Sequence, residues 1–246
     1  SPNMSKDGVG GAFVIWNDQS TSTLGHIYGT HLTPNSNDIV AQNIGLPLIS
    51  SNSQHSGVSI EVASGGSAIL VWTDDKNLDD SDLDIFAQRI DVGCNTLWST
   101  PEEGGILVCG AENVQQYAKV TYYDEDRSIV VWEDRRNNPN AGDVYAEFIS
   151  MDGELSDSNN GIPICTDNYM QIKPRVKASP LGAHIVWEDK RNMTSDIFAQ
   201  LITYDSGVQW EEDGRVICSA SGAQDQPRLT TDSFGGAYYV WMDERY

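Results

Sequence analysis

The chain has 246 residues, of which 15 are basic and 36 acidic, so its formal net charge at pH 7 is −21. This charge repels phosphate backbones and anionic lipid head groups, which argues against nucleic acid and membrane surfaces as partners. No apolar run approaches the roughly 20 residues that cross a bilayer, and we therefore expect no membrane insertion. Abundant Asp, Asn, Ser, Gly and Thr favour turns and strands over long helices.

One pattern occurs five times along the chain. A short apolar run such as AFVIW or SIVVW ends in Trp, and Asp follows two residues later. The tryptophans are Trp16, Trp72, Trp132, Trp187 and Trp241, at intervals of 56, 60, 55 and 54 residues. A regular period of this length predicts a repeat architecture.

Each full repeat contains four predicted strands, which we name A to D. Strand A resembles PRVKA or PRLTT, strand B is the run that ends in Trp, strand C resembles DIFAQ, and strand D ends in LPLI, ILVC, IPIC or RVIC. Strand B is apolar over five consecutive residues, so both of its faces must be covered. Stacked blades of a propeller provide that cover, whereas the coils of an open β-solenoid are usually much shorter than this period.

The sequence therefore predicts an all-β chain that forms one β-propeller domain over residues 1–246. The predicted blades span about 2–50, 56–110, 116–166 and 172–219, and a partial blade spans about 226–246. Four full blades and half a fifth indicate part of a larger ring, which further segments of a longer chain would complete. Exposed sheet edges would otherwise invite pairing with other chains.

Two resemblances concern this repeat. The pattern GGAhhVWxDxR followed by DIFAQ resembles repeats of secreted and surface-anchored bacterial proteins, which implies an extracellular or cell-surface location. Locally, Thr203, Asp205, Gly207 and Trp210 resemble the Asp-box of sialidase-like propellers, in the turn between strands C and D. In those families the box stabilises a turn on the face away from the active site. The catalytic residues of sialidases cannot be matched in this sequence, so we assign no catalytic residue.

The candidate ligand face is formed by the loops between strands B and C and between strands D and A. Residues on this face that follow each Trp are Asp18, Asp74, Asp134, Arg136, Asp189, Arg191 and Asp243. A ring of them could hold a protein or a glycan. The alternative is that each Asp caps its own hairpin and pairs with the Arg two positions later, because a residue repeated in every blade usually serves the blade.

The sequence predicts no cofactor except for a possible calcium ion. Asp80, Asp82 and Asp84 alternate in the acidic loop after Trp72, which resembles the oxygen spacing of Ca²⁺ loops, although the loop lacks the Gly and Glu of an EF-hand. The alternative is a solvated acidic loop. Cys109, Cys165 and Cys218 occupy equivalent places in successive repeats, too far apart to be bridged, and with Cys94 they are expected to be free thiols.

These observations favour a non-catalytic extracellular propeller that binds a protein or glycan, or acts as a scaffold within a larger protein. Two alternatives are a glycan-processing enzyme of sialidase-like architecture and a structural module of a stalk or filament. Carboxylate pairs such as Glu133 with Asp134 do not support the enzyme, because adjacent strand residues point to opposite faces. An enzyme should also break the symmetry of the repeats near the centre of the ring.

Overall fold

The computed structural model describes residues 2–18, 25–34, 45–50, 53–75, 82–98, 104–157 and 160–245. Its strands are β1 (Asn3–Lys6), β2 (Ala12–Asp18), β3 (His26–Leu32), β4 (Leu46–Ile49), β5 (Gln54–Val62), β6 (Ala68–Asp75), β7 (Asp84–Ile90), β8 (Ile106–Cys109), β9 (Gln115–Asp124), β10 (Arg127–Asp134), β11 (Asp143–Ser150), β12 (Ile162–Cys165), β13 (Gln171–Ser179), β14 (Gly182–Asp189), β15 (Asp196–Thr203), β16 (Gly207–Val208), β17 (Arg215–Cys218), β18 (Gln224–Thr231) and β19 (Ala237–Asp243). The only helical element among the described residues is a short 3₁₀ turn at Ser64–Gly66. The chain is all-β, as predicted.

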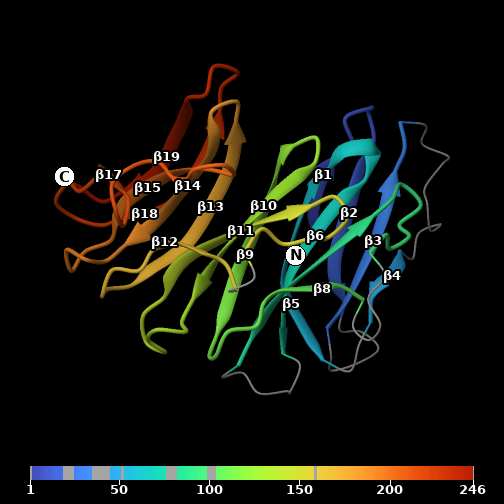
Figure 1. Ribbon diagram of the computed structural model, residues 1–246, viewed down its shortest axis with the longest axis horizontal. Helices are drawn as coiled ribbons and strands as arrows, with labels where there is room; N and C mark the ends of the chain where they lie inside the picture. The colour runs from blue at the N-terminus through green and yellow to red at the C-terminus, as the bar shows by residue number, and fades with distance from the viewer. Residues whose placement is uncertain are drawn as a thin grey trace.

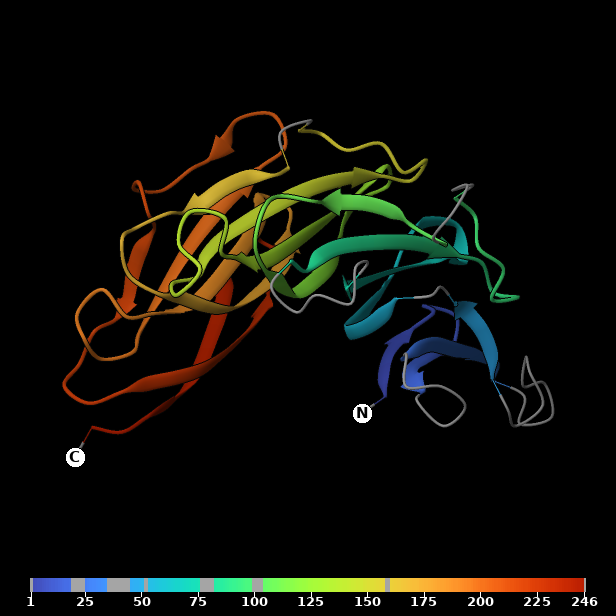
Figure 2. The same cartoon turned by 90° about the horizontal axis from the view of Figure 1, so that it is seen from below.

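The strands form antiparallel sheets in chain order. Sheets β1–β4, β5–β8 and β9–β12 have four strands each, the fourth sheet joins β13–β15 with both β16 and β17, and β18 pairs with β19. Figure 2 shows the five sheets side by side in an arc that runs from the N-terminus to the C-terminus. The first strands of successive sheets, β1, β5, β9, β13 and β18, contact one another in order (Figure 1) and form the inner layer of the arc. One predicted sheet per repeat is therefore present, and closure into a larger ring stays a prediction.

The second strand of each central sheet is buried because neighbouring sheets cover both of its faces. Every residue of β6, β10 and β14 is buried except Arg127, and Trp72, Trp132 and Trp187 are fully buried. The second strand of the last sheet, β19, is different, because its residues Tyr238, Val240 and Met242 are 64%, 62% and 60% exposed. Burial of this strand thus depends on a following sheet, which explains why its sequence is apolar on both faces.

A glycine lies over the indole of the tryptophan in each of the first four sheets. A Cβ atom added to Gly45, Gly105, Gly161 or Gly214 would collide with the six-membered ring of Trp16, Trp72, Trp132 or Trp187, respectively. The glycine precedes the fourth strand, so it lets the chain cross the indole before that strand pairs with the third. The Trp and the glycine therefore fix the position of the outer strand in the first four sheets.

Candidate functional site

The predicted ligand face contains a repeated hydrogen-bonded unit. Asp134 is fully buried, and its Oδ2 accepts hydrogen bonds from Trp132 Nε1 at 2.8 Å and from Arg136 Nη2 at 2.6 Å. Arg136 Nη2 also donates to the carbonyl of Asn160 at 2.7 Å. This arrangement ties the B–C hairpin to the start of the outer strand within one blade.

The same unit recurs with variations in the other blades. Asp189 accepts from Trp187 Nε1 at 2.9 Å and pairs with Arg191, and Asp243 pairs with Arg245. In the second sheet the partner of Asp74 is His55, at 3.2 Å, because His55 lies opposite Asp74 as Gln115 lies opposite Asp134. Asp18 ends β2 and lies opposite His26. These contacts lie within single blades, while Asp134 and Arg136 also contact Cys109 of the preceding sheet. Ligand binding by the Asp ring stays a prediction.

The Asp-box residues lie in the turn from β15 to β17. Thr203 Oγ1 accepts a hydrogen bond from the Ser206 amide at 3.2 Å, and Trp210 packs against Arg215, whose guanidinium carbon lies 4.8 Å from the ring centre. Asp205 is exposed, and Gly207 begins β16 in a left-handed conformation. In the corresponding turn of the second sheet the Asp stabilises the turn, since Asp91 Oδ1 accepts hydrogen bonds from the backbone amides of Gly93 and Asn95, both at 2.8 Å.

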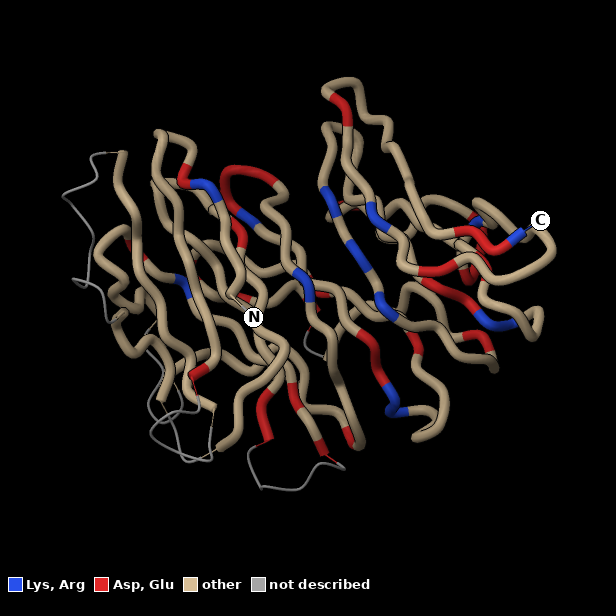
Figure 3. The backbone as a smooth tube through the Cα atoms, turned by 180° about the vertical axis from the view of Figure 1, so that it is seen from behind, with Lys and Arg blue, Asp and Glu red and all other residues tan. Residues whose placement is uncertain are grey.

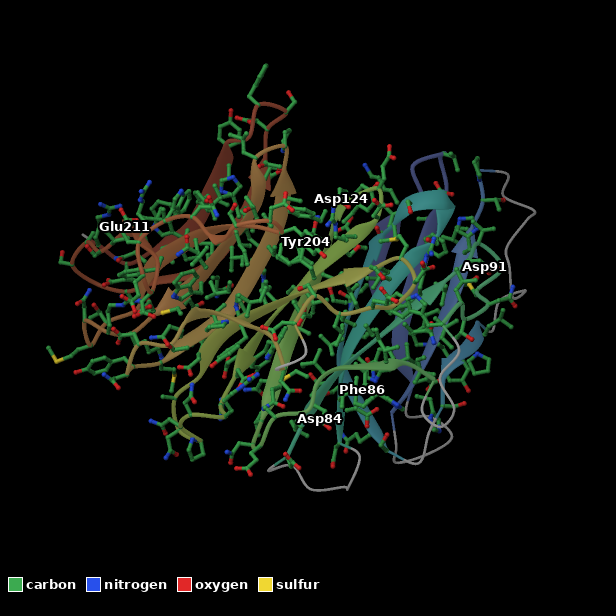
Figure 4. All side chains as sticks on the ribbon, in the orientation of Figure 1. Asp84, Phe86, Asp91, Asp124, Tyr204 and Glu211 are labelled. Atoms are coloured by element: carbon green, nitrogen blue, oxygen red, sulfur yellow. The ribbon has the colours of Figure 1, made fainter. Side chains whose placement is uncertain are left out.

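The calcium prediction concerns residues before β7 and at its start, in the second sheet. Asp80 lies outside the described residues, Asp82 precedes β7, and Asp84 is the first residue of β7, next to Phe86 in Figure 4. No group of three His, Cys, Asp or Glu side chains within the described ranges is arranged to hold a metal ion. Calcium binding therefore stays a prediction, to be tested by comparing the melting temperature in millimolar Ca²⁺ and in chelator. All four cysteines are free, as predicted.

A cavity of about 350 Å³ lies between the inner strands β9 and β13. Its lining residues are Tyr117, Lys119, Glu133, Arg135, Met170, Ile172, Lys173 and Arg175. Glu133 and Arg135 come from the end of β10, and Met170 from the connection between β12 and β13. The cavity is therefore at the same end of the blades as the predicted ligand face, but it is lined by Glu133 and Arg135 and not by their neighbours Asp134 and Arg136.

A β-bulge on the inner strands contains two of the residues that line the cavity, Tyr117 and Lys173. Tyr117 and Lys173 both have positive φ, at 59° and 54°, where the pairing of the inner strand with the second strand shifts register. Gly57 and Gln226 have the same conformation at the corresponding places in β5 and β18. Such bulges redirect side chains, and a non-glycine residue in this conformation is costly. The Gln that begins strand A was visible in the sequence, but the bulge two residues later was not.

Two buried glutamates stand at equivalent positions beside this inner layer. Glu133 Oε1 accepts hydrogen bonds from Gln116 Nε2 at 3.0 Å and from Arg135 Nη2 at 2.9 Å. Glu188 contacts Lys173 Nζ at 3.0 Å and accepts from the Gln226 amide at 2.7 Å. Glu133 is thus the carboxylate of the cavity, and Glu188 connects β14 to the lining residue Lys173 and to β18.

Three of the cations on the inner strands lie at equivalent positions in successive sheets. They are Lys119 on β9, Arg175 on β13 and Arg228 on β18. Burial, with the charges of Arg175 and Arg228, lowers the pKa of Lys119 to about 8, and burial together with the charge of Arg228 lowers the pKa of Arg175. Figure 3, which faces the inner layer, shows Lys and Arg gathered along the middle of the molecule and Asp and Glu mainly toward the strand ends. This basic region contrasts with the charge of the whole chain.

The opposite end of the blades has its own contacts between sheets. Arg127 stacks over the ring of Tyr204, 3.8 Å from its centre, and pairs with Asp124 at 2.9 Å. Asp124 and Tyr204 lie close together between the third and fourth sheets in Figure 4. These contacts join two sheets and leave the cavity as the better candidate for a ligand site.

Comparison with known proteins gives similarity to solved structures. No protein-family model matches the chain, and no curated protein matches it. The Penicillium chrysogenum α-L-arabinanase complexed with arabinobiose is 14% identical, with a TM-score of 0.60 over 96% of this chain and 71% of its own. An ulvan lyase of a new polysaccharide lyase family, bound to -[GlcA(1-4)Rha3S]-, is 11% identical with a TM-score of 0.59 over 93% and 60%. A Hadza microbial sialidase is 9% identical with a TM-score of 0.58 over 87% and 46%.

These comparisons support the propeller-type fold and correct the functional expectation. This chain spans less than half of the sialidase. The prediction of a non-catalytic binding or scaffold module, and with it that of no enzyme, is contradicted because these three structures of the same fold are glycan-processing enzymes. The weighed alternative, a glycan-processing enzyme, agrees better with them. At 9 to 14% identity the similarity establishes the fold alone, so activity is a matter for proposal. No helix of the described part is long and apolar enough to cross a membrane.

Proposed function

We propose that this chain belongs to a glycan-processing enzyme and that the cavity between β9 and β13 binds the glycan. The observation that carries the proposal is the set of unlike groups around that cavity. A buried carboxylate, Glu133, lies beside the phenol of Tyr117 and the cations Lys119 and Arg175. Carboxylate, phenol and amine are the side chains that serve in general acid–base catalysis.

The departure from repeat symmetry supports the same proposal. At the position of Tyr117 three other inner strands, β5, β13 and β18, have Gly57, Lys173 and Gln226, so the same bulge presents a different side chain in each of these four sheets. A structural residue would be expected to recur, as Trp132 and Asp134 do. The aromatic ring of Tyr117 is exposed, where it can stack on a sugar face. Known structures of this fold that process arabinan, ulvan or sialosides agree with the proposal.

An extracellular or cell-surface location is part of this proposal. It rests on the resemblance of the repeat to those of secreted and surface-anchored bacterial proteins. Degradation of polysaccharides that cannot enter a cell is consistent with that location.

The test is incubation of the protein with a panel of neutral and acidic polysaccharides. Hydrolysis is followed by new reducing ends, and elimination by the absorbance of the unsaturated product. We expect turnover of at least one polysaccharide and loss of turnover in Glu133→Gln. The matched control is Glu211→Gln, since Glu211 is also paired with an arginine, Arg215, but is exposed and lies outside the cavity. Absence of product from every polysaccharide would contradict the proposal.

A further inference from the structure

The three cations of the inner layer occupy equivalent places in three successive sheets. Lys119 lies opposite Val131, Arg175 opposite Val186, and Arg228 opposite Val240. The corresponding positions in the first two sheets are Asn3, opposite Ile15, and Ser59, opposite Val71. The inner layer is therefore basic over β9, β13 and β18 and neutral at this level over β1 and β5.

These three cations have no ion pair within the described part of the chain. Each makes one hydrogen bond to the carbonyl of the residue before it: Lys119 Nζ to Ala118, Arg175 Nη1 to Pro174, and Arg228 Nη1 to Pro227, all at 2.9 Å. Three other basic side chains differ from them, since Arg136, Arg191 and Lys177 are all paired with carboxylates. The remaining N–H groups of the three cations are available to a ligand.

The nearest carboxylates already have partners. Glu133 is paired with Arg135, and Glu188 with Lys173 and the amide of Gln226. Glu188 acts favourably on Arg175, but the charge of Arg228 and the partial burial of Lys119 and Arg175 oppose it. Like charges held together without counter-ions are costly, and an anion placed among them relieves that cost.

We propose that the basic cluster of Lys119, Arg175 and Arg228 makes the cavity a site for an acidic polysaccharide, one that bears carboxylate or sulfate groups. This inference rests on the proposed function and specifies its substrate class. Guanidinium groups match the planar oxygen pairs of carboxylate and sulfate, and Lys119 adds a point charge. Two of the three cations line the cavity itself, beside the exposed ring of Tyr117.

The experiment measures binding separately from turnover. Binding is followed by calorimetry with polygalacturonate as the carboxylate arm, chondroitin and chondroitin sulfate as a pair that isolates the sulfate contribution, and arabinan as the neutral arm. The variants are Lys119→Met, Arg175→Met and Arg228→Met. Arg215→Met is the matched control, because it removes the same charge from an exposed, paired side chain outside the cavity.

We expect an acidic polysaccharide to bind more tightly than arabinan, and each cluster variant to weaken it about tenfold while the control does not. Retained melting temperatures show that the variants are folded. The inference is overturned if arabinan binds as tightly, if the cluster variants bind acidic polymers like the wild type, or if an oligothymidylate binds as well as the acidic glycans. Turnover of a neutral polysaccharide would then leave the proposed function standing. If acidic glycans bound but gave no product, the proposed enzymatic function would be contradicted, and the proposed binding of acidic polysaccharides would not.

Discussion

Lys177 Nζ on β13 lies 2.7 Å from Glu61 Oε2 on β5, and the strand β9, which contacts both β5 and β13, belongs to the sheet between them. The ion pair thus connects the second and fourth sheets. The two side chains are 42% and 24% exposed, so solvent screens their attraction. We expect a double-mutant cycle with Lys177→Met and Glu61→Gln to give a coupling energy of about 0.2 to 1 kcal/mol in urea unfolding. The coupling should vanish in 1 M salt, and one that persists there would show that the pair is effectively buried.

Asp134→Ala removes the centre of a buried unit. The change leaves the Trp132 indole N–H and the Arg136 guanidinium without their carboxylate, and we expect a loss of about 3 to 5 kcal/mol in the free energy of unfolding. Asp243→Ala is the matched control, since Asp243 holds the same position in the exposed β19 and should cost much less. Equal losses in the two variants would show that burial does not set the strength of this unit.

Asp143 should make the stability of the protein depend on pH. Burial raises its pKa to about 6, with the charges of Asp134 and Asp213 acting in the same direction and the Asn137 hydrogen bond against them. A carboxyl with a raised folded pKa binds its proton more tightly in the folded state, so its contribution to stability falls as pH rises from about 4 to about 6. Asp143→Asn should therefore gain about 1 to 3 kcal/mol on the wild type between pH 4 and pH 7 in urea unfolding. A constant difference over that range would contradict the shifted pKa.

Glu147→Gln should stabilise the protein at neutral pH. Burial raises the pKa of Glu147, and its Oε2 has no hydrogen-bond partner within the described residues. Gln88 and Gln200 hold the equivalent places in the sheets on either side, and their amide groups donate to backbone carbonyls. We expect the melting temperature of the variant to exceed that of the wild type at pH 7 and the gap to shrink as Glu147 is protonated in acid. A lower melting temperature would mean that the hydrogen bonds from Ser156 to the carboxylate outweigh its burial.

Lys119 should titrate near pH 8 in the free protein. The chemical shifts of reductively ¹³C-methylated lysines report this pKa directly. Arg228→Gln should raise the pKa of Lys119, since one of the charges that disfavour its protonation is removed. Arg215→Gln changes the net charge equally and should leave that pKa unchanged. If the pKa of Lys119 did not change in Arg228→Gln, the two side chains would be too far apart to interact.

The sequence alone predicted an all-β chain with one antiparallel sheet per repeat, and it did not predict the candidate site. The Trp period located the second strand of every sheet, and that strand is buried in the three central sheets, where both of its faces are covered. The Asp and Arg that follow Trp132 stood out for the same reason, yet they are repeated because each blade needs them. Glu133 was set aside because its neighbour Asp134 points to the opposite face, and Lys119 was missed because its position varies between repeats. The bulge at Tyr117 leaves no residue pattern in the sequence. The enzyme was ranked below the non-catalytic module, since the symmetry of the repeats was given more weight than the positions that break it.

The bulge on the inner strands has a consequence for how such a protein can change. The left-handed residue is Gly57, Tyr117, Lys173 or Gln226, so the backbone accepts a small, aromatic, cationic or amide side chain at that point without altering the sheet around it. The four positions thus accept different side chains on the same backbone conformation. A designer who exchanges them alters what the inner layer presents to a ligand, blade by blade, while leaving the tryptophan packing between the sheets untouched.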